Sequence, residues 1–165
     1  MLTTNRIAVL GALFLLGIVV SLSTTSCCPP NCPPIPPAFS PMSWDPLLDE
    51  ADYETIIAET NSVIEKGEGT EFYAEARLYR GLALLKSGGD LEDTKADLEF
   101  AQTQFDTLNS VDLKKEQTLL LRGLMVTYTK LGDIGLAEEY KGRAIELSPE
   151  QSDIILREFE DAAGQ

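Results

Sequence analysis

The hydrophobic pattern of the chain changes character twice along its length. Residues 7–20 are all apolar or glycine, an unbroken run that follows one charged residue, Arg6. From Pro29 to Pro46 prolines interrupt every apolar stretch, and from Leu47 onward apolar residues recur three and four positions apart. These patterns are typical of a targeting segment, an extended linker and amphipathic helices, respectively. We therefore expect a signal segment at 1–26, a tether at 27–46 and a helical domain at 47–165.

The periodic region divides into segments of helical length. Glycine pairs and an Asn-Ser step separate them, because these residues favour turns. Ser148 is a further start signal, as an N-cap followed by Pro149 and by Gln151 as its capping-box partner. The pattern predicts an all-α stack of about six helices with short connections. The expected helices run from 47 to near Gly67, from Thr70 to Gly88, over 91–108, 113–131 and 134–147, and from Pro149 onward.

The helical region also repeats short sequences. Arg80-Gly81-Leu82 recurs as Arg122-Gly123-Leu124, and Gly89-Asp90 recurs as Gly132-Asp133. Ala101 likewise recurs as Ala144. The offsets are 42 residues for the first recurrence and 43 for the other two, and recurrence at a nearly constant offset over short helices indicates a helical-repeat protein.

The second of the two repeated units resembles the tetratricopeptide repeat family. That family has the pattern W-x2-L-G-x2-Y, then A-x3-F, then proline. The unit matches it at Leu121, Leu124, Met125, Tyr128, Ala137, Ala144 and Pro149, with Lys141 in place of the aromatic residue. The resemblance covers about residues 50–162 and implies stacked antiparallel helix pairs closed by a solvating helix after Pro149. Two registers remain open for the first unit, one with Leu82 and the other with Gly81 nearest the family's glycine.

The resemblance also implies a binding surface. In tetratricopeptide proteins the first helix of each pair lines a concave groove that binds segments of partner proteins. The residues expected to line it here are Tyr79, Ala83, Lys86, Arg122, Val126, Thr129 and Lys130. Such a groove would accept a protein or peptide that is acidic or carries a C-terminal carboxylate. The alternative is that these lysines and arginines are solvated and merely cover apolar surface with their stems.

The N-terminal segment has the pattern of a targeting signal. A short positive start, an apolar run and the small polar residues 21–26 are the three parts of a secretory signal. Thr24-Thr25-Ser26-Cys27 resembles the lipobox of bacterial lipoproteins, which implies lipidation of Cys27 and a membrane anchor on the extracytoplasmic side of the envelope, either periplasmic or at the cell surface. Ordinary cleavage with secretion, or an uncleaved anchor, are the alternatives.

The segment after Cys27 reads as a spacer. Every proline except Pro149 lies between Pro29 and Pro46, which favours an extended polyproline II conformation reaching roughly 50 Å. A Pro-rich ligand for another domain is the sharper alternative. Cys28 and Cys32 are candidates for a disulfide in an oxidising compartment. We expect Trp44 to pack the end of the tether onto the first helix.

Composition narrows the function. The net charge is −14, which disfavours nucleic-acid binding, and no histidine is present, which removes imidazole-based mechanisms and most zinc sites. No phosphate-binding loop or calcium loop occurs, and neighbouring carboxylates are common in so acidic a chain. We therefore expect no catalytic residues, cofactor or metal, and a binding module that holds a partner in an envelope assembly.

Three alternatives remain open from the sequence. The domain could be a structural subunit that packs into a larger envelope complex without a peptide groove. It could be a small enzyme that uses a pair of carboxylates in a carbohydrate cleft. Self-association into a homo-oligomer is also compatible, because a stack of two repeats is short for this architecture.

Overall fold

The computed structural model describes residues 44–70, 72–108 and 113–164, which all belong to one compact unit, 36–165. The all-α architecture is confirmed over these residues. Their helices are α1 (Trp44–Asp49), α2 (Tyr53–Ile64), α3 (Tyr73–Ser87), α4 (Leu91–Leu108), α5 (Lys114–Leu131), α6 (Ile134–Leu147), the 3-10 helix η4 (Pro149–Gln151) and α7 (Ser152–Ala163).

The predicted signal at 1–26 and most of the tether lie outside the described residues. The same is true of Cys27, Cys28 and Cys32, so lipidation and disulfide formation stay predictions. Within the described residues, no helix is both long enough and apolar enough to cross a membrane.

The chain begins its helical part earlier than the hydrophobic pattern indicated. The pattern predicts that Trp44, Asp45 and Pro46 belong to the tether, but they form the first turn of α1. The single helix expected from Leu47 to near Gly67 is in fact two helices, because the chain turns sharply at Ala51, whose φ is +61°. Alanine rarely adopts the left-handed backbone conformation, so an alanine at position 51 does not predict a turn.

Three helix pairs share one type of corner. The first helix of each pair, α1, α3 or α5, is followed by a residue with positive φ: Ala51, Gly88 or Gly132. An aspartate then caps the second helix: Asp52 accepts from the backbone N–H of Thr55, Asp90 from those of Glu92 and Asp93, and Asp133 from that of Leu136. These caps satisfy N–H groups that the helix itself leaves free. The stack therefore has three antiparallel pairs and not two.

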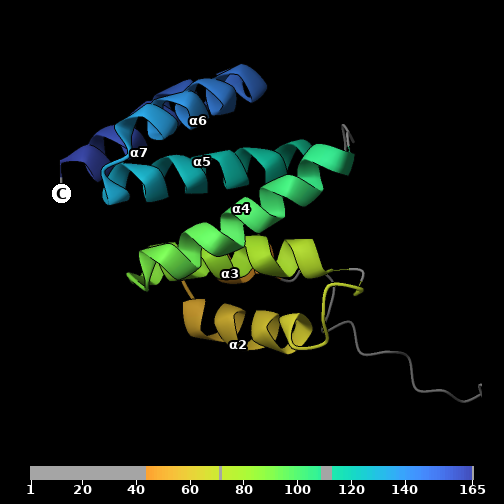
Figure 1. Cartoon of the computed structure of the whole chain (residues 1–165). Coiled ribbons are helices and arrows are strands. Elements are labelled where there is room, and N and C mark those ends of the chain that lie inside the picture. The colour runs from red at the N-terminus through yellow and green to blue at the C-terminus, as the bar shows by residue number, and fades with distance from the viewer. Residues whose placement is uncertain (1–43, 71, 109–112, 165) are drawn as a thin grey trace, which may run out of the picture. The chain divides into compact units, whose positions relative to one another are not determined.

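The pairs follow one another as a stack that ends in α7. Each helix from α2 to α6 packs on the next helix in the chain, as Figure 1 shows. In addition α3 contacts α5, and α5 contacts α7, so alternate helices form one continuous side of the stack. The last helix covers both α5 and α6 and buries Ile155 completely.

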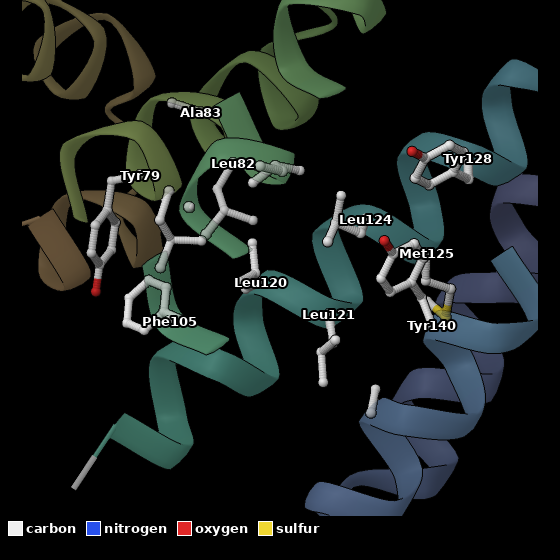
Figure 2. Close-up of a cluster of buried hydrophobic side chains, with 14 of the residues drawn as sticks. Tyr79, Leu82, Ala83, Phe105, Leu120, Leu121, Leu124, Met125, Tyr128 and Tyr140 are labelled. Carbon is white, nitrogen blue, oxygen red and sulfur yellow. The ribbon is translucent and has the colours of Figure 1, made fainter. Parts of the chain in front are cut away.

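The core runs through the middle of the stack. Figure 2 shows side chains of α3, α4 and α5 meeting in it, with Tyr128 and Tyr140 stacked between α5 and α6 at a ring-centroid distance of 5.5 Å. The small residues expected at the helix contacts, Ala101, Ala137 and Ala144, are all fully buried. Burial of this apolar surface is the main favourable term in folding.

Gly81 and Gly123 let three helices approach closely. A Cβ at Gly81 would lie 2.8 Å from Cδ2 of Leu98 on α4, and a Cβ at Gly123 would lie 2.9 Å from Cδ2 of Leu82 on α3. Leu98 is also 3.1 Å from the Cβ position of Gly123, so this fully buried side chain fills the space between α3 and α5.

The repeated Arg-Gly-Leu sequences do not occupy equivalent places. Arg80 pairs with Asp97 on the next helix, α4, whereas Arg122 pairs with Glu158 on α7. The two corner glycines, Gly88 and Gly132, are two positions further apart in sequence than the two Arg-Gly-Leu copies. Two positions correspond to about 200° around a helix, which explains the different partners.

The predicted capping box at Ser148 is also corrected. Ser148 precedes η4, but its side chain makes no capping hydrogen bond; its Oγ lies 2.7 Å from the Oγ1 of Thr118 on α5. Both residues are buried, so the two hydroxyl groups satisfy each other inside the stack. The helix proper begins at Ser152.

Candidate functional site

A pocket opens on the side of the stack formed by alternate helices. It has a volume of about 290 Å³ and draws residues from α1, α3, α5 and α7 only. Its lining consists of Leu48, Leu82, Leu85, Lys86, Leu119, Arg122, Gly123, Val126, Lys130, Glu158, Asp161 and Ala162. We call this set the alternate-helix groove.

The groove has an apolar floor. Leu82 and Leu85 from α3 are nearly buried, and Val126 from α5 is half-buried beside them. Leu48 from α1 and Ala162 from α7 add further apolar lining. The lining at this level offers no hydrogen-bonding side chain, so it suits aliphatic groups.

Charged side chains form the rim, and one ion pair dominates it. The guanidinium of Arg122 donates through Nε to Oε2 of Glu158 at 2.8 Å and through Nη2 to Oε1 at 2.6 Å. Its Nη1 also donates to Oε1 of Gln151 at 3.1 Å. Such a two-point contact fixes geometry and is stronger than a single bond. Arg122 is therefore fully engaged inside the protein.

Two lysines of the rim are less engaged. The Nζ of Lys86 is 4.0 Å from Oε1 of Glu158, at the limit of an ion pair, and its side chain is 51% exposed. Lys130 is exposed and forms no ion pair with any residue in the described part of the chain. Both lysines lie two residues before a corner glycine, Gly88 or Gly132, so they occupy equivalent positions in successive pairs.

The structure places four of the seven predicted groove residues in this lining and three elsewhere. Lys86, Arg122, Val126 and Lys130 line the pocket. Tyr79, Ala83 and Thr129 are 2%, 0% and 6% exposed, so the prediction that they face a partner is corrected. Each of the three is a core residue of the stack.

The burial of Tyr79 has a specific cause in α1. Its hydroxyl donates to Oδ1 of Asp45 at 2.6 Å, and its ring lies against that of Trp44 at 5.5 Å. Burial, and then the hydrogen bond to the Asp45 carboxylate, raise the pKa of Tyr79 well above its usual value. The proline-rich pattern places Asp45 in the tether, so it does not predict that α1 contacts this face of α3.

Trp44 contacts α2, which is part of the first expected helix, but it belongs to α1, and the chain before it lies outside the described residues. Its side chain is fully buried, and its Nε1 donates to Oε2 of Glu59 on α2 at 2.9 Å. Lys115 on α5 forms an ion pair with Asp45 as well. The first helix is thus attached to α2, α3 and α5 at once.

Sequence reasoning missed one whole wall of the groove. Glu158, Asp161 and Ala162 come from α7, and their spacing of three and four places them on one helix face. This spacing is a sequence signal for a common face, but the resemblance to a terminal solvating helix predicts that α7 shields the core and not that it lines a groove.

A second pocket lies on another side of the stack, among α4, α5 and α6. Its volume is about 370 Å³, and its apolar base is formed by core side chains that include Phe105, Leu120 and Leu121. Arg143 and Asp106 face each other at its rim, 3.8 Å apart. The rim carries both signs of charge close together and selects no ligand class.

No protein-family model matches the chain, and neither a curated protein nor a solved structure is significantly similar to it.

Proposed function

We propose that this chain is a membrane-tethered, extracytoplasmic interaction module of the tetratricopeptide type, whose alternate-helix groove holds a segment of a partner protein in a bacterial envelope assembly. The observation that carries the proposal is the groove itself: an apolar floor with two under-engaged lysines, built only from the first helix of each pair and α7. An apolar pocket with a few polar groups at its rim is the usual form of a recognition site.

The regularity of the stack supports this function. Three pairs, each with a residue of positive φ after its first helix, followed by α7, give the minimum number of units that such stacks need for stability. The outward residues of α7 include Asp153, Arg157 and Glu160, all exposed, which suits a helix that ends a stack. A stack that is stable by itself can devote its remaining surface to binding.

The membrane anchor is the second half of the proposal and rests on the sequence. A lipid on Cys27 and a proline-rich spacer would present the groove at some distance from the membrane surface. Intact mass spectrometry of the mature protein tests this half. We expect a chain that begins at Cys27 and carries the mass of a diacylglyceryl group; a free amino-terminal Cys27 or a retained Met1 would rule it out.

Photo-crosslinking in the native envelope tests the groove. A photoreactive amino acid at position 130, on the groove rim, should give a covalent adduct with one partner protein. The same amino acid at position 139, an exposed place on α6 outside the groove, is the matched control. Identical adducts from both positions, or none from position 130, would argue against a partner in the groove.

A structural subunit without a peptide groove is the second candidate. Ile134, Ile154 and Leu156 are large apolar residues that are 41–46% exposed on α6 and α7. Exposed apolar side chains of this size are compatible with packing of α6 and α7 against another protein or a second copy of the chain. Under this alternative the crosslinks would arise from positions on α6 and α7.

A further inference from the structure

Glu158 is part of the groove lining and forms ion pairs with two of its cationic residues. Its two carboxylate oxygens bind Arg122 on α5, at 2.6 and 2.8 Å, and Oε1 also lies 4.0 Å from the Nζ of Lys86 on α3. One side chain of α7 therefore reaches cations on the two preceding helices of the groove. A carboxylate in this position resembles the group that an acidic partner would bring.

Of the cationic residues in the groove, the two lysines are the ones that can still bind a further anionic group. Arg122 already donates two bonds to Glu158 and one to Gln151, whereas Lys86 has only the distant contact and Lys130 has none among the described residues. A lysine ammonium has three donors that can turn toward a new acceptor. An incoming carboxylate would therefore meet Lys86 and Lys130 first, with the charge of Glu158 close by.

We propose that Glu158 is an internal carboxylate ligand of the groove, and that the partner segment carries an acidic residue whose carboxylate shares Lys86 and Lys130 in competition with Glu158. This inference rests on the proposed function, because it assigns a chemistry to the same groove. Glu158 would then set the specificity of the groove. Its negative charge weakens the binding of every anionic segment, so only segments that also make apolar contacts with the groove bind.

The apolar floor of the groove supplies these additional favourable contacts. Leu82, Leu85 and Val126 line the same pocket as the two lysines, so a segment with aliphatic side chains beside its carboxylate can contact both kinds of residue. On the α7 side, Asp161 lines the pocket and disfavours a second acidic residue there. The occupant is thus an extended segment with one acidic residue flanked by aliphatic ones, from a partner protein.

Two capped peptides provide the test with the full chain in detergent micelles. One is a fluorescently labelled Ser-Leu-Asp-Leu-Ser peptide, and the other has Asn in place of Asp. Fluorescence anisotropy gives the Kd of each for the unaltered chain, for Glu158→Gln and for Glu160→Gln. The last variant is a matched control, since it removes the same charge from an exposed position on the same helix outside the groove.

Glutamine at position 158 can still accept from Arg122, so the fold should persist, which a thermal melt verifies. We expect the Asp peptide to bind Glu158→Gln about threefold more tightly than the unaltered chain, as removal of one partly exposed like charge implies. The Asn peptide should show no such gain, and Glu160→Gln should change neither Kd. Equal effects of Glu158→Gln and Glu160→Gln would overturn the inference.

Lys86→Gln is a second variant that does not depend on the Arg122 pair. It should weaken the Asp peptide about threefold and leave the Asn peptide unchanged. Failure of the Asp peptide to bind either the unaltered chain or Glu158→Gln would also overturn the inference. The proposed function would survive that result if crosslinks from position 130 are found, and it would fall with the inference only if they are absent.

Discussion

At the scale of single residues, backbone conformation explains the corners of the stack. Three residues hold equivalent positions with positive φ, and two of them are glycines, which adopt this conformation without steric cost. The third is Ala51, whose Cβ is crowded at a φ of +61°. The first pair therefore keeps the corner of the repeat without the residue that best suits it.

Replacing Ala51 with glycine should stabilise the protein. The left-handed conformation costs an alanine about 1–2 kcal/mol, and the greater chain entropy of glycine in the unfolded state offsets roughly half of the gain. We expect the free energy of unfolding in urea to rise by about 0.5 kcal/mol for Ala51→Gly. At Ala58, an exposed position inside α2, the same substitution should lower it by about 1 kcal/mol. Similar losses at both positions would contradict the strain at Ala51.

Close contacts between helices assign opposite effects to two Gly→Ala changes. A methyl group at Gly81 would meet the buried Leu98 at 2.8 Å, whereas one at Gly142, inside α6, would have no neighbour within 4 Å. We expect Gly81→Ala to lower the free energy of unfolding by about 1–3 kcal/mol through overpacking. Gly142→Ala should raise it by up to about 1 kcal/mol, because alanine is the better helix former. Thermal melts of both variants check the prediction, and stabilisation by Gly81→Ala would refute it.

At the scale of elements, α1 is the part that the sequence did not reveal. Its apolar residues suggested a continuous helix with α2, and its first turn was assigned to the tether. Six residues with a proline give too little periodicity to define an element, so tertiary contacts decide it. These contacts are the burial of Trp44 and the bonds of Asp45 to Tyr79 and Lys115.

The bond between Tyr79 and Asp45 predicts how stability depends on pH. The pKa of Tyr79 is raised in the folded protein, so the neutral phenol is favoured there. Its contribution is complete below an unfolded-state pKa of about 10 and is lost as pH rises above that value. Up to about 1.4 kcal/mol should be lost through Tyr79 by pH 11. Urea unfolding between pH 8 and 11 should show a shallower decline for Tyr79→Phe; equal slopes would contradict the raised pKa.

The longer helices could be predicted because each has several turns of periodic apolar residues and a clear stop signal. From α3 to α6 each helix has several turns of apolar residues and ends at a glycine, an Asn-Ser step or a serine, so helical class and approximate limits follow from spacing alone. The groove was predictable only in part. Lys86 and Lys130 lie at equivalent positions near the helix ends, but exposure of Tyr79 and Thr129 depends on neighbours that spacing does not specify.

At the scale of the molecule, the acidic composition acquires a structural meaning. The chain carries a net charge of −14, yet its groove presents Lys86, whose ion pair with Glu158 is 4.0 Å long, and Lys130, which forms no ion pair in the described part of the chain. A local positive site in an acidic protein attracts an anionic group at short range while the remaining surface repels anions at long range. Recognition in the groove would therefore depend on contact and not on long-range steering.

The groove as a binding site is the central claim, and affinity for the partner found by crosslinking tests it most directly. The full chain and the variants Lys130→Glu and Lys95→Glu would be titrated with that partner. Lys95 lies on α4 outside the groove, where it pairs with Glu92. We predict that Lys130→Glu lowers the affinity about tenfold, roughly 1.4 kcal/mol, while Lys95→Glu leaves it unchanged. Unaltered affinity of Lys130→Glu would contradict the claim.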